Sequence, residues 1–296
     1  MVKDKSIGSR LFDALNYTLL IGAGALCLAP FLHITAVAFS KAGPVAGNLV
    51  QFIPIDPTLQ NFVIAFENPR IWSAFFWAVA RAVAGTALSV GVCVLTAYPM
   101  SRSADAFPPR TALVVLFLFC MLFSGGLIPF FLVVRALGLY NTFGSLIVPF
   151  AFSPWITILI MNFFRNLPRE LEEAALIDGA THMDVLFRIF VPLSLPVLAT
   201  VSLFQAVFFW NDWFFPSLLL KSNDMYPLQT YLQVFLNQVN VTQMFASGNL
   251  EEFLALVSNR GLRAATLLIS IVPILLVYPL LQRYFIKGLV LGAVKG

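Results

Sequence analysis

Long apolar runs separated by shorter polar segments dominate the chain. A helix that crosses a membrane needs about 20 mostly apolar residues to span about 30 Å of hydrocarbon. Six segments meet this requirement, and we expect each to form a helical span. They are residues 16–39, 72–100, 111–134, 143–164, 196–220 and 264–281. Prolines within several runs fit this interpretation, because membrane helices tolerate proline where neighbouring groups bond the freed carbonyls.

The composition supports a membrane protein. Of the 296 residues, 59% are hydrophobic and 11% are charged, whereas a soluble domain has about 25% charged residues. One water-soluble core could not bury 30 Phe against only 14 Asp plus Glu. This excludes a secreted disulfide scaffold, a nucleic-acid-binding protein and an ordinary cytosolic enzyme. We therefore predict an all-α, polytopic protein that forms a single membrane domain over residues 1–296.

The charges of the loops predict the orientation in the membrane. Lys and Arg are enriched in cytoplasmic loops. With both termini inside, 11 of the 18 Lys and Arg lie on the inner side and six on the outer side, and the remaining one, Arg81, lies within a span. We therefore expect cytoplasmic termini. The net charge of +4 then reflects orientation among membrane lipids, and no nucleic-acid partner is needed to explain it.

Few residues could support catalysis or hold a metal ion. The three cysteines lie in apolar stretches, and the only histidines are His33 and His182. We expect no metal site and no Ser-His-Asp or Cys-His catalytic arrangement. The chain also lacks the G-x-x-x-x-G-K-[ST] run that cradles nucleotide phosphates. It is therefore not expected to be an enzyme by itself, and any ATP hydrolysis would require a partner.

The loop between the fourth and fifth spans predicts two short helices. Acidic residues favour the start of the first helix, and Gly179 is expected to end it in the left-handed conformation. Thr181 and Asp184 have the spacing of a capping box, which would begin the second helix. That helix is expected to end before Pro192, because proline disfavours a helical residue before it.

Two interpretations of this loop, residues 165–195, follow from the residues alone. It could be a helical hairpin that lies on the membrane surface. Alternatively it could dock into another protein, because Ala174 and Ala175 form a small-residue face that permits a close approach. The surrounding charges would then fix the register of docking.

Several positions at fixed spacing define a motif in the loop. They are Glu173, Ala174, Ala175, Gly179, Ile189 and Pro192, with Val191 where the motif usually has Leu. This motif resembles the EAA loop of ABC importer membrane subunits. Further segments resemble the carbohydrate branch of that family, namely the smaller membrane subunit of maltose-type importers. These are residues 97–102, 210–212, 226–230 and 285–296.

The resemblance implies a type I ABC importer fold in the bacterial cytoplasmic (inner) membrane. Six helices would pair with a second homologous permease subunit, and residues 173–179, including Asp178, would form a coupling helix. This helix would dock on one of two cytoplasmic ATPase subunits, which bind ATP and Mg²⁺, whereas this chain binds no cofactor. Lys295 and Gly296 in the C-terminal tail would also reach the ATPases. An extracytoplasmic solute-binding protein would deliver the substrate.

Two charges lie within predicted spans. Arg81 and Asp212 are about 14 Å and about 12 Å from the outer ends of their spans at 1.5 Å per residue. A charge at such depth is costly and usually faces a partner or a cavity. The two residues could form an ion pair that joins two helices. Alternatively they could line a solute path together with Asn211, with Trp210 and Trp213 either stacking on sugar rings or packing in the protein.

We therefore predict the membrane-spanning permease subunit of an ATP-driven importer for a carbohydrate. Larger oligosaccharides are favoured, and Arg81 would suit an acidic glycan such as alginate. The alternative is a secondary transporter or channel that needs no separate ATPase. Such a protein would be expected to carry a series of membrane carboxylates or histidines for ion coupling, whereas the predicted spans contain one Asp and one His.

Overall fold

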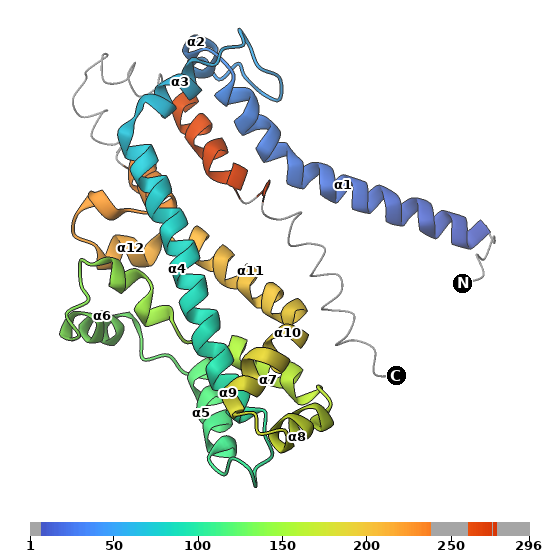
Figure 1. The fold of residues 1–296 in the computed structure, drawn as a ribbon. Helices are drawn as coiled ribbons and strands as arrows, with labels where there is room; N and C mark the ends of the chain where they lie inside the picture. The colour runs from blue at the N-terminus through green and yellow to red at the C-terminus, as the bar shows by residue number, and fades with distance from the viewer. Residues whose placement is uncertain (1–6, 238–259, 274, 277–296) are drawn as a thin grey trace. The chain divides into compact units, whose positions relative to one another are not determined.

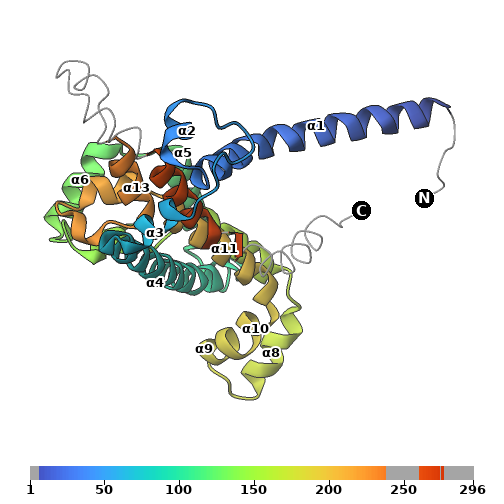
Figure 2. The same ribbon diagram turned by 90° about the horizontal axis from the view of Figure 1, so that it is seen from above.

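The computed structural model describes residues 7–237, 260–273 and 275–276, which fall into two compact units. The first unit comprises residues 1–69 and 235–272, and the second comprises residues 70–234 and 273–296. All regular secondary structure in the described residues is helical apart from one isolated bridge (Figures 1 and 2). The predicted all-α fold class is therefore confirmed for this part of the chain.

The first unit is built on a long N-terminal helix. Its elements are α1 (Ile7–Ala38), α2 (Ala42–Ala46), α3 (Gln60–Glu67) and a helical segment at residues 260–273. Small side chains allow α1 to meet this last segment, because Ala38, Ala264 and Ala265 form a buried cluster. Asn61 ties α3 to the end of α1 by donating from Nδ2 to the Ala38 carbonyl at 2.8 Å. Close packing and hydrogen bonds thus hold this unit together.

The second unit is organised around one long helix, α4 (Pro69–Met100). The elements from α4 to α13 belong to this unit, except for a few terminal residues of α4 and α13. The other elements are α5 (Arg110–Leu122), α6 (Leu127–Ala136), η1 (Phe143–Leu146), η2 (Val148–Phe150), α7 (Pro154–Arg165), α8 (Arg169–Ile177), α9 (His182–Val185), η3 (Leu186–Phe190), α10 (Val191–Leu193), α11 (Leu195–Asn211), α12 (Phe214–Leu219), η4 (Asn223–Met225) and α13 (Leu228–Asn237).

One stripe of α4 is buried along much of its length. Its members recur every four residues, which places them on one face of a helix. They are Arg81, Gly85, Ser89, Cys93 and Ala97. Four of the five are small, and small residues let helices approach closely in a membrane, where packing rather than the hydrophobic effect drives association. This face of α4 is therefore the packing surface of the unit.

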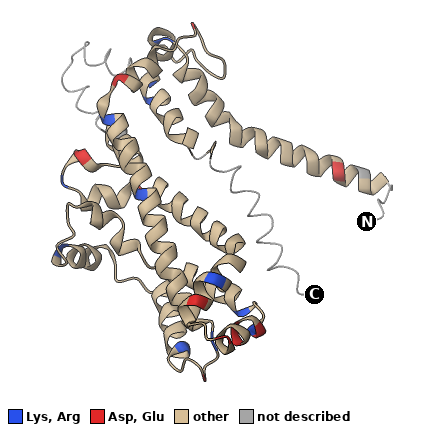
Figure 3. Cartoon of the chain, viewed as in Figure 1, with Lys and Arg blue, Asp and Glu red and all other residues tan. Residues whose placement is uncertain are grey.

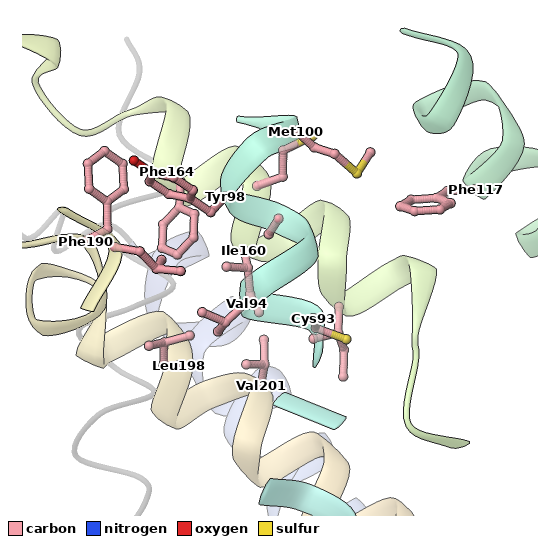
Figure 4. Close-up of a cluster of buried hydrophobic side chains, with 14 of the residues drawn as sticks. Cys93, Val94, Tyr98, Met100, Phe117, Ile160, Phe164, Phe190, Leu198 and Val201 are labelled. Atoms are coloured by element: carbon pink, nitrogen blue, oxygen red, sulfur yellow. The ribbon is translucent and has the colours of Figure 1, made fainter. Parts of the chain in front are cut away.

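A core of apolar side chains continues this packing toward the C-terminal end of α4. Val94 of α4, Ile160 of α7 and Val201 of α11 are all buried in it (Figure 4). Phe190 of η3 packs edge-on against Phe164, with their ring centroids 5.4 Å apart. The core thus joins α4, α7 and α11 to the loop that carries the predicted motif.

Three predicted spans are not continuous helices. The segment 111–134 divides into α5 and α6, which meet at 117°. Within 143–164, two 3₁₀ turns lie at 48° to α7. Within 196–220, α11 ends at Asn211 and α12 begins at Phe214. The expectation of uninterrupted helices was therefore wrong in these three segments.

Local chemistry accounts for the breaks. Gly126, at the start of α6, has φ +85°, a conformation that glycine adopts without steric cost. Ser153 caps α7 by accepting from the Ile156 backbone N–H, which starts a new helix there. Within the described residues, α1 and α4 alone are long and apolar enough to cross a membrane. The number rises to at most five if three bent pairs each count as one span, namely α5 with α6, residues 143–150 with α7, and residues 182–193 with α11, which are bent by 82°. The total of six crossings stays a prediction, because 264–281 lies partly outside the described residues.

Gly85 provides a test of the α4 packing face. A Cβ atom added there would lie 2.6 Å from Cζ of Phe209 on α11. We expect Gly85→Ala to lower the free energy of unfolding by about 1–3 kcal/mol, as overpacking of a tight core does. Thermal unfolding of the purified protein in detergent measures the effect.

Gly91→Ala is the matched control, because Gly91 lies on the same helix with open space around it. Alanine is the better helix former, so this variant should be at least as stable as the natural chain. Equal losses for both variants would contradict the packing proposed for Gly85.

Candidate coupling site and membrane charge pair

The predicted motif lies in a compact group of helices at the C-terminal end of α4. The helix α8 begins after Pro168, and Glu170 and Glu172 in its first turn complement the positive end of the helix dipole. Gly179 follows α8 with φ +85°, as the spacing predicts. Figure 2 shows α8, α9 and α10 standing out together from the rest of the second unit.

A capping box begins α9. Thr181 Oγ1 accepts from the Asp184 backbone N–H at 3.2 Å, and the Thr181 N–H donates to Asp184 Oδ2 at 3.1 Å. Hydrogen bonds from Thr181 lower the pKa of the Asp184 carboxyl below its ordinary value. A lowered pKa stabilises the fold at neutral pH, and this contribution is lost only as the pH falls through that pKa.

The second helix does not end before Pro192, so this expectation was wrong. After α9 the chain forms the π-helical turn η3 and then α10, in which Pro192 occupies one of the first two positions. Proline suits the first turn of a helix, because its missing N–H is not needed there. The wider π turn before it changes the hydrogen-bond register, which allows the chain to pass through Pro192 to α11.

The motif residues divide between an exposed face and the core. Glu173, Ala174 and Asp178 are exposed on or just after α8. Ala175 and Ile189 are partly buried and pack against the apolar core. Two of the six motif positions, Ala175 and Ile189, therefore anchor the hairpin to the unit, while the other four are exposed.

The exposed side of α8 includes apolar residues. Ile177 at its C-terminal end is 85% exposed, and Leu171 and Leu176 are also exposed. Acidic side chains surround them, and Figure 3 shows charges gathered around α8 and the loop that follows α4, while the long helices are mostly uncharged. This combination of apolar contacts and flanking charges is suited to docking on another protein.

A cluster of charged and aromatic side chains, most of them buried or partly buried, links α8 and α9 to α4. Arg102, just after α4, forms an ion pair with Glu172 of α8. Its guanidinium carbon lies 4.3 Å from the ring centroid of Tyr98 and 4.6 Å from that of Phe190. The Tyr98 hydroxyl lies 3.3 Å from Glu172 Oε1, to which it donates, and 3.4 Å from His182 Nδ1. We refer to these five residues as the Arg102 cluster.

Burial lowers the pKa of the Arg102 guanidinium, but arginine still keeps its charge at neutral pH. The predictions from sequence missed the roles of Arg102 and Glu172, because an Arg after a span and a Glu in a first helical turn are usually solvated. One available signal was the segment 97–102, which resembles the family and contains both Tyr98 and Arg102. A cavity of about 700 Å³ borders the cluster and is also lined by Arg110 and Arg169.

Arg81 and Asp212 form an ion pair within the helical core. Arg81 Nη2 lies 2.5 Å from Asp212 Oδ2, and the Arg81 side chain is 0% exposed. The guanidinium also donates to three backbone carbonyls. Nη1 bonds those of Phe209 at 3.2 Å and Asp212 at 2.9 Å, and Nε bonds that of Leu146 at 3.2 Å. Arg81 therefore bonds both its counterion and the backbone around it.

These bonds stabilise the break between α11 and α12. The last carbonyls of a helix have no partner within the helix, and Arg81 binds two carbonyls at the end of α11. On the other side of the break, Asp212 Oδ1 accepts from the backbone N–H groups of Phe214 and Phe215, each at 3.1 Å. One ion pair thus bonds backbone groups on both sides of an interruption in a predicted span.

The other candidate path residues differ in accessibility. Trp210 is buried and packs edge-on against Phe75, with centroids 6.0 Å apart. Asn211 and Trp213 are exposed. Because Arg81 is enclosed by its bonding partners, it is not available to a solute in this conformation. Of the five residues predicted for the solute path or the helix pairing, Asn211 and Trp213 are therefore the accessible candidates.

The structure thus combines apolar helices with a helical hairpin that has an exposed face and with a buried ion pair. A family model described as "Binding-protein-dependent transport system inner membrane component" matches residues 45–290. The chain belongs to this family, which comprises permease subunits of ABC importers, so the resemblance found in the sequence is confirmed.

Individual relatives match nearly the whole chain. Protein LplC of Bacillus subtilis is 39% identical over 97% of this chain and 96% of its own length. The polygalacturonan/rhamnogalacturonan transport system permease protein YtcP of the same organism is 37% identical, over 97% and 99%. A chain of a bacterial ABC transporter involved in the import of the acidic polysaccharide alginate matches with a TM-score of 0.87 and 30% identity, covering 96% of this chain and 100% of that one.

Substitution of Arg81 tests its bonding role. We expect Arg81→Met to lower the free energy of unfolding by about 3–5 kcal/mol, as loss of one partner of a buried pair does. Arg135→Met is the control, because Arg135 is exposed on α6. Denaturation of the purified protein in detergent measures both.

The charge-reversed double variant separates an ion pair from the wider bonding role. Aspartate at position 81 cannot donate to the three carbonyls that Arg81 bonds, so R81D/D212R should remain as unstable as the single variants. Recovery of stability in this double variant would show that charge pairing alone is sufficient.

Proposed function

We propose that this chain is a membrane permease subunit that imports acidic oligosaccharides. Two relatives support the substrate class, since one is named for polygalacturonan and rhamnogalacturonan transport and a second belongs to an alginate importer. All three of these glycans are polymers that contain uronic acids. Arg81 does not carry this proposal, because Asp212 neutralises its charge within the core.

The docking surface is the exposed side of α8. In our proposal it lies in the cytoplasm and seats in a cleft of an ATPase, with Glu173 and Asp178 setting the register and Ile177 supplying apolar contact. The observation that carries this is the pattern of burial, in which Ala175 and Ile189 anchor the hairpin while these side chains remain accessible. A hairpin that lay on the lipid surface would not need the exposed acidic residues Glu173 and Asp178.

The complete importer would contain further subunits. A second homologous permease, two ATPases that bind ATP and Mg²⁺, and an extracytoplasmic solute-binding protein complete the proposed assembly. This chain would then be non-catalytic, and closure of the ATPases would move α8 and switch the helices from inward-open to outward-open. Lys295 and Gly296, proposed to reach the ATPases, lie outside the described residues.

A secondary transporter is less well supported. Such a protein needs a membrane carboxylate or histidine that is free to bind the coupling ion. Asp212, the one carboxylate within a predicted span, is occupied by Arg81 and by two backbone N–H groups. Family membership also favours the ATP-driven mechanism.

Reconstitution tests the proposed function. The chain is co-expressed with its partner subunits, inserted into liposomes, and supplied with solute-binding protein loaded with oligogalacturonate, alginate oligosaccharide or a neutral maltooligosaccharide. We expect the acidic glycans to stimulate ATP hydrolysis and ATP-dependent uptake above the neutral one. Uptake by this chain without any ATPase would contradict the importer, whereas stimulation by the neutral glycan alone would contradict the substrate class.

Gly179 tests the coupling loop. Proline cannot adopt the φ of +85° found there, and it would remove the hydrogen bond from the Gly179 N–H to the Leu176 carbonyl. We expect Gly179→Pro to abolish glycan-stimulated ATP hydrolysis while the chain still inserts into the membrane.

Gly138→Pro is a closely matched control. Gly138 has φ +71°, and its N–H donates to the Arg135 carbonyl, so proline would disturb the backbone at Gly138 in the same way as at Gly179. Gly138 lies outside the coupling loop. If both variants retain the same stimulated ATPase activity per assembled complex, residues around Gly179 do not mediate coupling.

A further inference from the structure

The Arg102 cluster lies next to the docking surface but supplies none of the side chains proposed to dock. The side chains of Arg102 and Glu172 are 17% and 11% exposed, whereas Glu173 and Asp178 face outward. Glu173 and Leu176 of α8 line the same cavity as the cluster, so the cluster adjoins the docking surface without supplying the side chains proposed to dock. Its role must be sought in what it joins inside the second unit.

Side chains from α4, α8 and η3 meet at the Arg102 guanidinium, and His182 of α9 joins them through Tyr98. Arg102 and Tyr98 come from the end of α4, Glu172 from α8, His182 from α9 and Phe190 from η3. A planar guanidinium can stack on aromatic rings and bond a carboxylate through its edge at the same time, which a lysine ammonium cannot do. The two rings and the carboxylate therefore hold α8 and η3 against α4 from different directions.

The bonding of Arg102 makes this junction sensitive to a single change. Its Nε and Nη2 atoms are buried and have no hydrogen-bond partner within the described residues. Glu172 is therefore the main compensation for the buried charge, supported by the cation–π contacts with Tyr98 and Phe190. Removal of either charge leaves the other buried and unpaired.

Beyond this junction, α4 is fastened to α11 at successive turns. Gln205 Nε2 of α11 donates to Ser89 Oγ, the Phe209 ring packs directly on Gly85, and Arg81 bonds Asp212 just after α11. These contacts lie on the buried stripe of α4 and connect it with the break before α12. A displacement of the end of α4 is thereby transferred to the middle of the predicted membrane region.

We propose that Arg102 is a positioning residue for energy coupling, which makes α8 and α4 move as one body when an ATPase displaces α8. The inference rests on the proposed function, because it assigns a route for motion that begins at the docked hairpin. The route runs from α8 through Arg102 to α4, and through the buried stripe of α4 to the Arg81–Asp212 pair. Arg102 therefore acts through other residues and contacts no substrate.

Transport per ATP hydrolysed is the measurement that tests this role. In the complete importer in liposomes, we expect Arg102→Met to reduce glycan uptake per ATP about tenfold, within the usual range of coupling between sites. Assembly with the ATPases should persist, because the exposed side of α8 is unchanged. Arg102→Lys should recover only part of the ratio, since it restores the charge without planar stacking.

Glu172→Gln provides a milder second variant, because the amide keeps the size of the side chain and its contact with Tyr98. It should lower the same ratio of uptake to ATP hydrolysed. The R102M/E172Q double variant should have the same ratio as R102M, since the two substitutions remove the same interaction. If Arg102→Met fails to assemble, Glu172→Gln decides the question by itself.

Arg188→Met is the matched control. Arg188 also pairs with an acidic residue of the same hairpin, Asp184, but its side chain is 81% exposed. Exposed pairs contribute little, so its transport ratio should equal that of the natural chain. If the natural importer shows glycan-stimulated hydrolysis and Arg102→Met and Glu172→Gln both keep the natural ratio, this inference is overturned. Absence of stimulation in the natural importer would instead contradict the proposed function.

Discussion

The bonding around Arg81 allows a predicted membrane span to be interrupted. A helix break inside hydrocarbon frees backbone carbonyls and N–H groups that no water can satisfy. Arg81 binds carbonyls at the end of α11 and in η1, while Asp212 binds N–H groups at the start of α12. The ion pair therefore does two things at once. It neutralises two buried charges, and it makes irregular backbone tolerable at that depth.

This bonding also explains why α4 is the central element of the second unit. Its stripe of small residues admits α11 closely, and the one large member of that stripe is the arginine that binds the break. At its C-terminal end, the Arg102 cluster performs a similar task between α4 and the hairpin. Arg81, which is buried, and Arg102, which is partly buried, thus link one long helix with segments distant in sequence, and the proposed coupling follows from that arrangement.

Local patterns in the sequence were sufficient for the helical class, the left-handed Gly179 and the capping box at Thr181, because each depends on neighbouring residues. The breaks in three spans were not predicted, since apolar composition is the same on both sides of a break. The continuation through Pro192 was also missed, because it depends on a π turn. The pairing of Glu172 with Arg102 could not be predicted, because the two residues meet only through the tertiary fold, although the segment 97–102 gave a signal for Tyr98 and Arg102.

A distance measured across the proposed rigid body tests the central claim most directly. Spin labels at Leu88 of α4 and Met183 of α9, both exposed, would be placed in a variant without the natural cysteines and measured in the complete importer. The account predicts the same Leu88–Met183 distance distribution without nucleotide and with ATP bound. A second label pair, one on this chain and one on the partner permease, should show a change in distance between the same two states. A shift of the Leu88–Met183 distance between these states would contradict the account, because the hairpin would then move independently of α4.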